Sequence, residues 1–244
     1  MINSSALKWG LCVAVAVVCG CAPAKVTYQA SSELERHRMA TIAVLPFEVL
    51  KTPQYLPTAQ AEVPVPEGAR RSDISFSIPP SGQPREKEVT VSVPLLAAEK
   101  VTGLVLAKVQ NREGVRWVRP EEAAAVVRSL GSPERGVTAE KQAWQVASRL
   151  GADAALIGRV LVYQERGGSK YGGSPAEVGF EVRLIGPDGV TLWSGNYYER
   201  QRPFVEDAIG AFQRGFVFVT ADELAEYGAK QIAKQLPVGT PGSR

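Results

Sequence analysis

Short apolar runs alternate along the chain with segments in which apolar residues recur every three or four positions. Residues 41–47 (TIAVLPF) are almost continuously apolar and β-branched, which predicts a central strand buried on both faces and ending at Pro46. Residues 154–165 predict a second strand and residues 177–185 a third, with strict alternation. The Pro-Asp-Gly at 187–189 predicts a turn, after which residues 190–199 return as the antiparallel partner. Residues 117–118 favour one more, very short strand.

Four segments have helical periodicity. They are residues 95–110 after Pro94, 120–130 before Gly131, 138–150 before Gly151, and 220–236. The last begins with Thr-Ala-Asp-Glu, the pattern of a capping box. The first has an apolar face that we expect to be buried, made of Leu95, Ala98, Val101, Val105 and Val109. A shorter helix is predicted at 205–213.

Residues 51–93 interrupt this regular pattern. Eight of the chain's 17 prolines fall within residues 50–94, which favours an extended loop. Two alternating patches, at 74–78 and 89–93, predict an irregular hairpin inside it. We therefore predict an α/β fold: a single layered domain over residues 41–236, with a mixed sheet of about four to six strands, helices packed on it, and a Pro-rich insertion at 51–93. Residues 237–244 are expected to be a flexible tail.

The N-terminus has the three-part form of a secretory signal. Residues 1–8 are polar with one positive charge, and residues 9–19 are uncharged and apolar. Such a run fits the roughly 7–15 residues of a signal h-region and is shorter than the roughly 20 needed to span a bilayer. A secretory signal is therefore favoured over a transmembrane helix.

The end of this run, Val18-Cys19-Gly20-Cys21, resembles the lipobox of bacterial lipoproteins. It departs from the usual pattern at Cys19, where Ala or Ser is commoner. The resemblance implies removal of residues 1–20, diacylation of the Cys21 sulfur, and a lipidated tether over 21–40. Two acyl chains hold a protein stably on a membrane, whereas one does so only marginally. Ala22, rather than Asp, favours the outer membrane at its periplasmic face; a generic signal peptide is the alternative.

Composition argues against several kinds of site. The net charge of +3 is small, and lysines and arginines form only short clusters along the chain. Nucleic-acid binding needs basic residues gathered on one face, so we expect no nucleic-acid partner. All three cysteines lie within the first 21 residues, which excludes a disulfide framework beyond them. A metal site at Cys19 and Cys21 lacks further ligands, since the only histidine is His37. We predict no metal and no cofactor apart from the covalent lipid on Cys21.

No catalytic constellation is predicted. His37 lies in a linker between Arg36 and Arg38, no G-x-S-x-G occurs, and a serine–lysine pair stays open. The acidic pairs at 121–122, 206–207 and 222–223 fall in the first turns of predicted helices. There carboxylates interact favourably with the exposed backbone N–H groups. The glycine-rich 167–174 lies between two strands, so it indicates a hairpin connection and not a phosphate-binding loop. Period two places Trp193 and Tyr197 on one strand face, apart from Tyr198.

Three stretches together resemble one superfamily of periplasmic lipoproteins. They are IAVLPF at 42–47, LGADAALIGRVLVY at 150–163 and VGFEVRLIGPDGVTLWSGNY at 178–197. The superfamily includes the curli-secretion channel subunit, the lipoprotein activator of penicillin-binding proteins, and the N-terminal domain of the Tol-system β-propeller protein. The resemblance implies a shared fold whose structural signature here is Pro46, Gly151, Asp153, Gly158, Gly189 and Trp193. It supplies no catalytic residue.

The leading hypothesis is a lipid-anchored, non-enzymatic periplasmic protein that binds other envelope proteins in an assembly, activator or accessory role. Its expected binding surface is the insertion at 51–93 together with the loop at 167–175. Two alternatives are an oligomeric component of an outer-membrane secretion channel and an envelope hydrolase. The channel would need membrane strands of about 9–11 residues, longer than any alternating run in the insertion. The partner, the process and the oligomeric state stay open.

Overall fold

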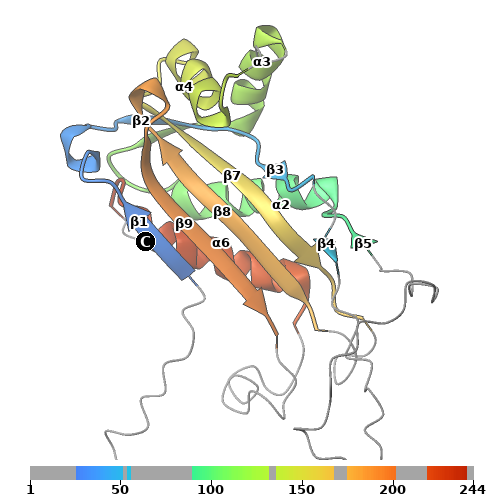
Figure 1. The fold of residues 1–244 in the computed structure, drawn as a ribbon. Helices are drawn as coiled ribbons and strands as arrows, with labels where there is room; N and C mark the ends of the chain where they lie inside the picture. The colour runs from blue at the N-terminus through green and yellow to red at the C-terminus, as the bar shows by residue number, and fades with distance from the viewer. Residues whose placement is uncertain are drawn as a thin grey trace, which may run out of the picture.

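The fold is a mixed β-sheet with helices on both faces. The computed structural model describes residues 26–51, 54–55, 90–131, 136–167, 175–201 and 219–240 (Figure 1). Within them lies a seven-stranded sheet in the order β1-β9-β8-β7-β2-β6, with β3 paired to β7 beside this path. Four α-helices pack on the sheet. The predicted α/β class, with a mixed sheet and helices packed on it, is confirmed.

The predicted strands and helices that fall in the described residues lie within a few residues of their expected positions, and β1 and β3 are present in addition. The strands are β1 (Val26–Ala30), β2 (Thr41–Val44), β3 (Glu48–Val49), β6 (Arg116–Val118), β7 (Ala154–Gln164), β8 (Glu177–Ile185) and β9 (Thr191–Arg200). The helices are α2 (Leu95–Val109), α3 (Pro120–Leu130), α4 (Ala139–Arg149) and α6 (Ala221–Gln235). Two short 3-10 turns are also present, η1 (Leu34–Arg36) and η3 (Pro187–Gly189). In the part of the chain that the structure describes, none of the helices combines the length and apolarity needed to cross a bilayer.

Strand β2 is the centre of the fold because its side chains enter two separate cores. Ile42 and Val44 pack in the cluster that includes α2 and α6, whereas Ala43 and Leu45 pack in the cluster that includes α3 and α4. Residues 42–44 have no exposed surface. The prediction of a central strand buried on both faces is confirmed.

The hairpin of β8 and β9 follows the predicted register and faces. Leu184 pairs with Trp193, and the turn between the strands uses positive φ angles at Asp188 (57°) and Gly189 (80°). Trp193 and Tyr197 are each 1% exposed, whereas Tyr198 is 55% exposed. The predicted division between a buried and an exposed face is therefore confirmed.

Both ends of the described chain are bound more closely than the sequence predicts. The expected tether, 21–40, contains β1, which pairs antiparallel with β9 at the edge of the sheet. The expected flexible tail, 237–244, contains the buried Val238, and Thr240 bridges the backbone of Glu113. Edge pairing and single-residue bridges rely on backbone hydrogen bonds, which side-chain patterns alone do not predict.

The insertion at 51–93 is described only at its two ends. There, β4 (Gln54–Tyr55) pairs antiparallel with β5 (Thr90–Val91). The predicted partner patch at 74–78, most of the 167–174 loop, the helix at 205–213 and the acidic pair at 206–207 lie outside the described residues. So do Val18, Cys19, Gly20 and Cys21 of the lipobox.

Helix starts follow the predicted local chemistry. Thr220 and Glu223 form the capping box at α6, with the Thr220 hydroxyl accepting from the Glu223 N–H and the Glu223 carboxylate accepting from the Thr220 N–H. Glu121 and Glu122 lie in the first turn of α3, and Asp222 lies in that of α6. The helix-start interpretation of these two acidic pairs is confirmed.

Two glycines inside helices have opposite surroundings, so we expect alanine to have opposite effects at the two. A Cβ at Gly103 in α2 would meet nothing within 4 Å, whereas one at Gly228 in α6 would lie 2.3 Å from the ring of the buried Tyr197. Gly103→Ala should raise the free energy of unfolding by about 0.5–1 kcal/mol, because alanine restricts the unfolded chain. Gly228→Ala should lower it by about 1–3 kcal/mol through overpacking. Urea titration measures both, and shifts of the same sign would contradict this packing.

Candidate functional site

The connections that leave β2 and β6 cross opposite faces of the sheet, and two hollows lie beyond the carboxyl end of β2. Strand β2 is parallel to β6 on one side and to β7 on the other. Helix α2, which precedes β6, packs on one face of the sheet, whereas α3 and α4, which link β6 to β7, pack on the other (Figure 1). In open α/β sheets, ligands bind beyond the carboxyl ends of strands where the connections diverge in this way. A ligand site is therefore expected beside residues 45–48, which follow β2.

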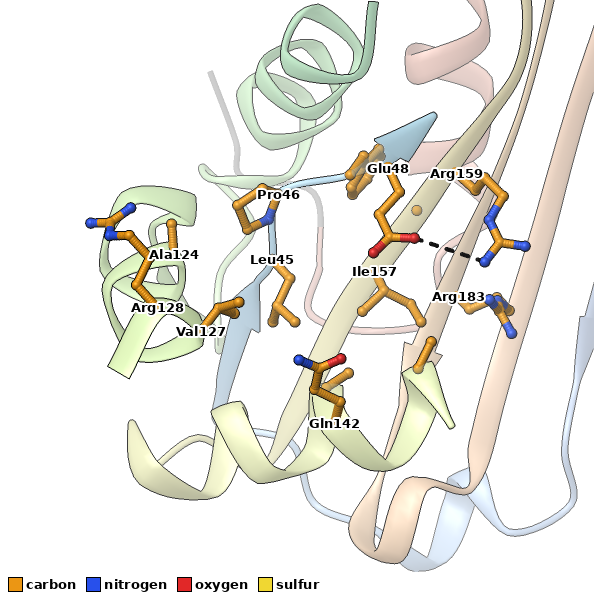
Figure 2. Close-up of a pocket in the computed structure, with 14 residues that line it drawn as sticks. Leu45, Pro46, Glu48, Ala124, Val127, Arg128, Gln142, Ile157, Arg159 and Arg183 are labelled. Atoms are coloured by element: carbon orange, nitrogen blue, oxygen red, sulfur yellow. Dashed lines mark ion pairs between the residues drawn. The ribbon is translucent and has the colours of Figure 1, made fainter. Parts of the chain in front are cut away.

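On the α3/α4 side this segment borders a cavity of about 320 Å³, which we call the arginine cavity. Its apolar walls include Leu45 from the end of β2, Val127 from α3, Ala143 from α4 and Ile157 from β7. Its polar lining residues are Glu48, Arg128, Gln142, Arg159 and Arg183. Figure 2 shows most of these side chains around one space, coming from two helices and two strands and from residues 45–48, whereas the Arg128 guanidinium points outward from α3.

The three arginines of the cavity differ in how strongly the chain itself pairs them. Arg183 forms an ion pair and hydrogen bond with Glu140, and a second ion pair with Glu181 at 3.5 Å. Arg159 has one long contact, 3.9 Å from its Nη2 to the Glu48 carboxylate, and both side chains are substantially exposed. The Arg128 guanidinium has no hydrogen-bond or ion-pair partner among the described residues, but it points away from the cavity (Figure 2). Arg159 is thus the weakly paired guanidinium of the cavity.

The Arg183 pair is well fixed. Burial alone would raise the pKa of Glu140, but hydrogen bonds from its own backbone N–H, from Thr138 and from Arg183 outweigh it, and the pKa is lowered. Glu140 therefore stays ionised beside Arg183 at neutral pH. The Nε–H of Arg183 is buried and has no acceptor in the described part of the chain.

The same segment also borders a wider hollow of about 980 Å³, lined by residues of α2, the first half of α3 and the start of α6, which we call the α2 groove. Pro46, Phe47 and Ala124 line both hollows. In the groove, Leu95 is 80% exposed and Leu96 is 60% exposed at the start of α2. Of the apolar face predicted for α2, Ala98, Val101, Val105 and Val109 are buried, and the prediction is wrong only for Leu95, which lies at the first position of the helix.

The edge of the α2 groove is acidic. Among its lining residues, five are acidic and one, Lys100, is basic. Lys100 Nζ lies 2.8 Å from the Asp222 carboxylate, and hydrogen bonds from Lys100 and from the Tyr163 hydroxyl lower the pKa of Asp222. Glu99 and Glu121 have no partner among the described residues. The groove therefore combines exposed leucines with unpaired carboxylates.

Several residues of the sequence signature meet around this region. The Asp153 carboxylate accepts hydrogen bonds from the backbone N–H groups of Ala40 (2.9 Å) and Thr41 (2.8 Å), which fixes the start of β2. Phe47 lies against Gly158 so closely that a Cβ there would be 2.5 Å from its ring. Pro46 and Gly158 line the arginine cavity.

The remaining signature residues have structural positions elsewhere. Gly151 has a φ of 63° after α4, Gly189 turns the β8–β9 hairpin, and Trp193 is buried in the core shared with α6. A Cβ at Gly189 would lie 3.0 Å from the backbone of Lys141 in α4, so this turn also packs against a helix.

Comparisons with known proteins give structural similarities only. No family model matches the chain, and no curated protein matches it. A PelC dodecamer from Paraburkholderia phytofirmans covers 90% of this chain and 98% of its own at 12% identity and a TM-score of 0.41. The lipoprotein GNA1162 from Neisseria meningitidis covers 72% and 95% at 14% identity and a TM-score of 0.37. The C-terminal domain of LpoB from Escherichia coli covers 78% and 94% at 13% identity and a TM-score of 0.35.

The sequence did not predict either hollow, although it contained a signal for one. Arg159 interrupts the apolar run of β7, and Arg183 occupies a regular position of β8 between apolar neighbours. Charged residues in the middle of strands that pair side by side indicate a polar site on one sheet face. Which helices cover that face, and how much space they leave, depends on tertiary packing.

Proposed function

We propose that the chain is a lipid-anchored, non-enzymatic protein of the bacterial cell envelope that binds other envelope proteins through the α2 groove. The observation that carries this proposal is the outer side of α2, where Leu95 and Leu96 are exposed beside a large hollow. Contiguous exposed apolar surface with a polar rim is typical of a protein–protein interaction site. The groove begins two residues after the insertion at 51–93, the surface that the sequence favoured.

The side chains that line the groove indicate what kind of segment a partner would place there. Burying one exposed leucine side chain contributes about 1.5–3 kcal/mol, so two adjacent leucines can anchor an apolar segment. Because Glu99 and Glu121 are unpaired in the described structure, a segment with lysine or arginine beside its apolar residues complements the rim. Gly103 leaves the middle of the helix open, since a Cβ there would meet nothing within 4 Å.

The membrane anchor in this proposal is the covalent lipid on Cys21, the only non-protein group that we expect the chain to carry. Such an anchor holds the protein at a membrane, and Ala22 favours the periplasmic face of the outer membrane. The lipobox resemblance and the absence of a recognisable catalytic constellation in the sequence support this assignment.

Site-specific crosslinking in cells tests the groove as the binding surface. A photoreactive residue at Gly103 should crosslink to an envelope protein, and Leu96→Glu should reduce that product at least fivefold by placing a charge against the apolar partner. The double variant Glu99→Lys, Glu121→Lys should reduce it as well, through charge reversal at the rim. Quantitative immunoblotting of the crosslinked product measures both effects.

The matched control is Val190→Glu, a charge placed on another exposed apolar residue, in the loop before β9. It should leave the crosslinked product unchanged. Thermal denaturation must show that Leu96→Glu remains folded. A folded Leu96→Glu variant with the full amount of the product would refute the groove as the binding surface.

A further inference from the structure

We propose that the arginine cavity is a binding site for a carboxylate attached directly to a small apolar group, such as the terminal residue of a polypeptide or a short branched acid. The site is separate from the α2 groove, and the proposal does not depend on what the groove binds. It rests on the cavity's shape, its apolar walls and the pairing of its arginines.

Size and lining set the class of ligand. A volume of about 320 Å³ is at the lower end of the roughly 300–1,000 Å³ of small-molecule sites, so the ligand is small. The apolar walls, formed by residues such as Leu45 and Ile157, suit a hydrocarbon group. The polar lining residues suit an anion, because guanidinium groups donate paired N–H bonds to carboxylates and Gln142 offers an amide donor.

The chain's own carboxylates show which anion these arginines accept. Glu140 and Glu181 pair with Arg183, and Glu48 makes the long 3.9 Å contact with Arg159. The Glu140–Arg183 pair is mostly buried and holds the Arg183 side chain in place. The Glu48–Arg159 pair is long and exposed, and such pairs contribute little to stability. A ligand carboxylate can therefore replace Glu48 at Arg159 with small loss.

Arg159 supplies the donors for that ligand. Its guanidinium is engaged in the described residues only by the long Glu48 contact, and about a third of its side chain is exposed. A carboxylate in the cavity has the two oxygens needed to accept paired N–H bonds from one guanidinium.

Binding of small probes to the full chain in lipid nanodiscs tests the site, with ligand-detected NMR giving dissociation constants. The probes are N-acetylleucine, its neutral amide, and 4-methylpentanoate. We expect the amide to bind at least tenfold more weakly than N-acetylleucine, since it lacks the charge that the arginines recognise. Binding of N-acetylleucine alone identifies a polypeptide end as the source, and binding of 4-methylpentanoate alone identifies a free acid.

Three substitutions connect the binding to the cavity. Arg159→Gln should weaken N-acetylleucine binding about tenfold, and Glu48→Gln should strengthen it severalfold by removing the internal competitor. Arg149→Gln, at an exposed arginine near the end of α4, is the matched control and should change nothing. The proposal is overturned if neither acid binds at millimolar concentration, if the amide binds equally well, or if Arg159→Gln has no effect in a folded variant.

Discussion

Replacing Cys21 with serine is expected to abolish lipid labelling and to release the protein from membranes. In a lipoprotein the thioether to the diacyl group forms on the cysteine sulfur, so a serine at position 21 would leave the chain without the acyl chains that hold it on a membrane. Labelling with radioactive palmitate, followed by separation of membrane and soluble fractions, measures both effects. The expected change is from nearly all membrane-bound to nearly all soluble.

The neighbouring cysteine supplies the control for this experiment. Cys19→Ser removes the other thiol of the C-x-C stretch and places a commoner residue at that lipobox position, so labelling and membrane attachment should persist. If Cys21→Ser remains in the membrane fraction after a salt wash, the lipoprotein assignment is wrong.

Truncation of Phe47 is expected to be the most destabilising change at the candidate site, and a second substitution should partly reverse it. Phe47→Ala should lower the free energy of unfolding by about 3–5 kcal/mol through loss of a buried ring. Gly158→Ala alone should cost about 1–3 kcal/mol, because its methyl group would lie 2.5 Å from that ring. The double variant should lose less unfolding free energy than the two single variants added together, by about 0.5–3 kcal/mol. The reason is that the alanine methyl group then fills part of the space left by the ring.

Denaturant titration of the four proteins in this cycle gives the coupling energy. The matched control pairs Phe47→Ala with Gly103→Ala, where the added methyl group contacts nothing within 4 Å and the effects should add. Equal additivity in both cycles would show that Phe47 and Gly158 do not touch. A coupling found only in the Gly158 cycle would show that Phe47 of the 42–47 stretch and Gly158 of the 150–163 stretch are matched by direct contact.

The sequence predicted most helices and central strands well because their signals are local. Pro120 and Gly131 bound α3, and the capping box at Thr220 and Glu223 starts α6, each through contacts within a few residues. The alternation in β8 reports directly which side chains face the core, since successive strand residues point to opposite faces.

The parts that the sequence did not predict depend on contacts between distant segments. Strand β1 pairs with the edge strand β9, and four of its five residues are exposed, so no buried face marks it as part of the sheet. Leu95 fits the periodic face of α2 but lies where neither sheet nor helix covers it. The arginine cavity needs residues from four elements in one place, and no single stretch contains that information.

The edge strand β1 sets how far from a membrane the domain can work. Its first residue, Val26, follows the proposed lipidated Cys21 by five positions, which can extend over at most about 18 Å. Val26 pairs with Tyr197, close to the end of the sheet where Gln164, Glu177 and Arg200 align. With Cys21 lipidated as proposed, this length would hold that end of the sheet close to the lipid headgroups. The opposite end, where α3 and α4 lie, would then face away from the membrane.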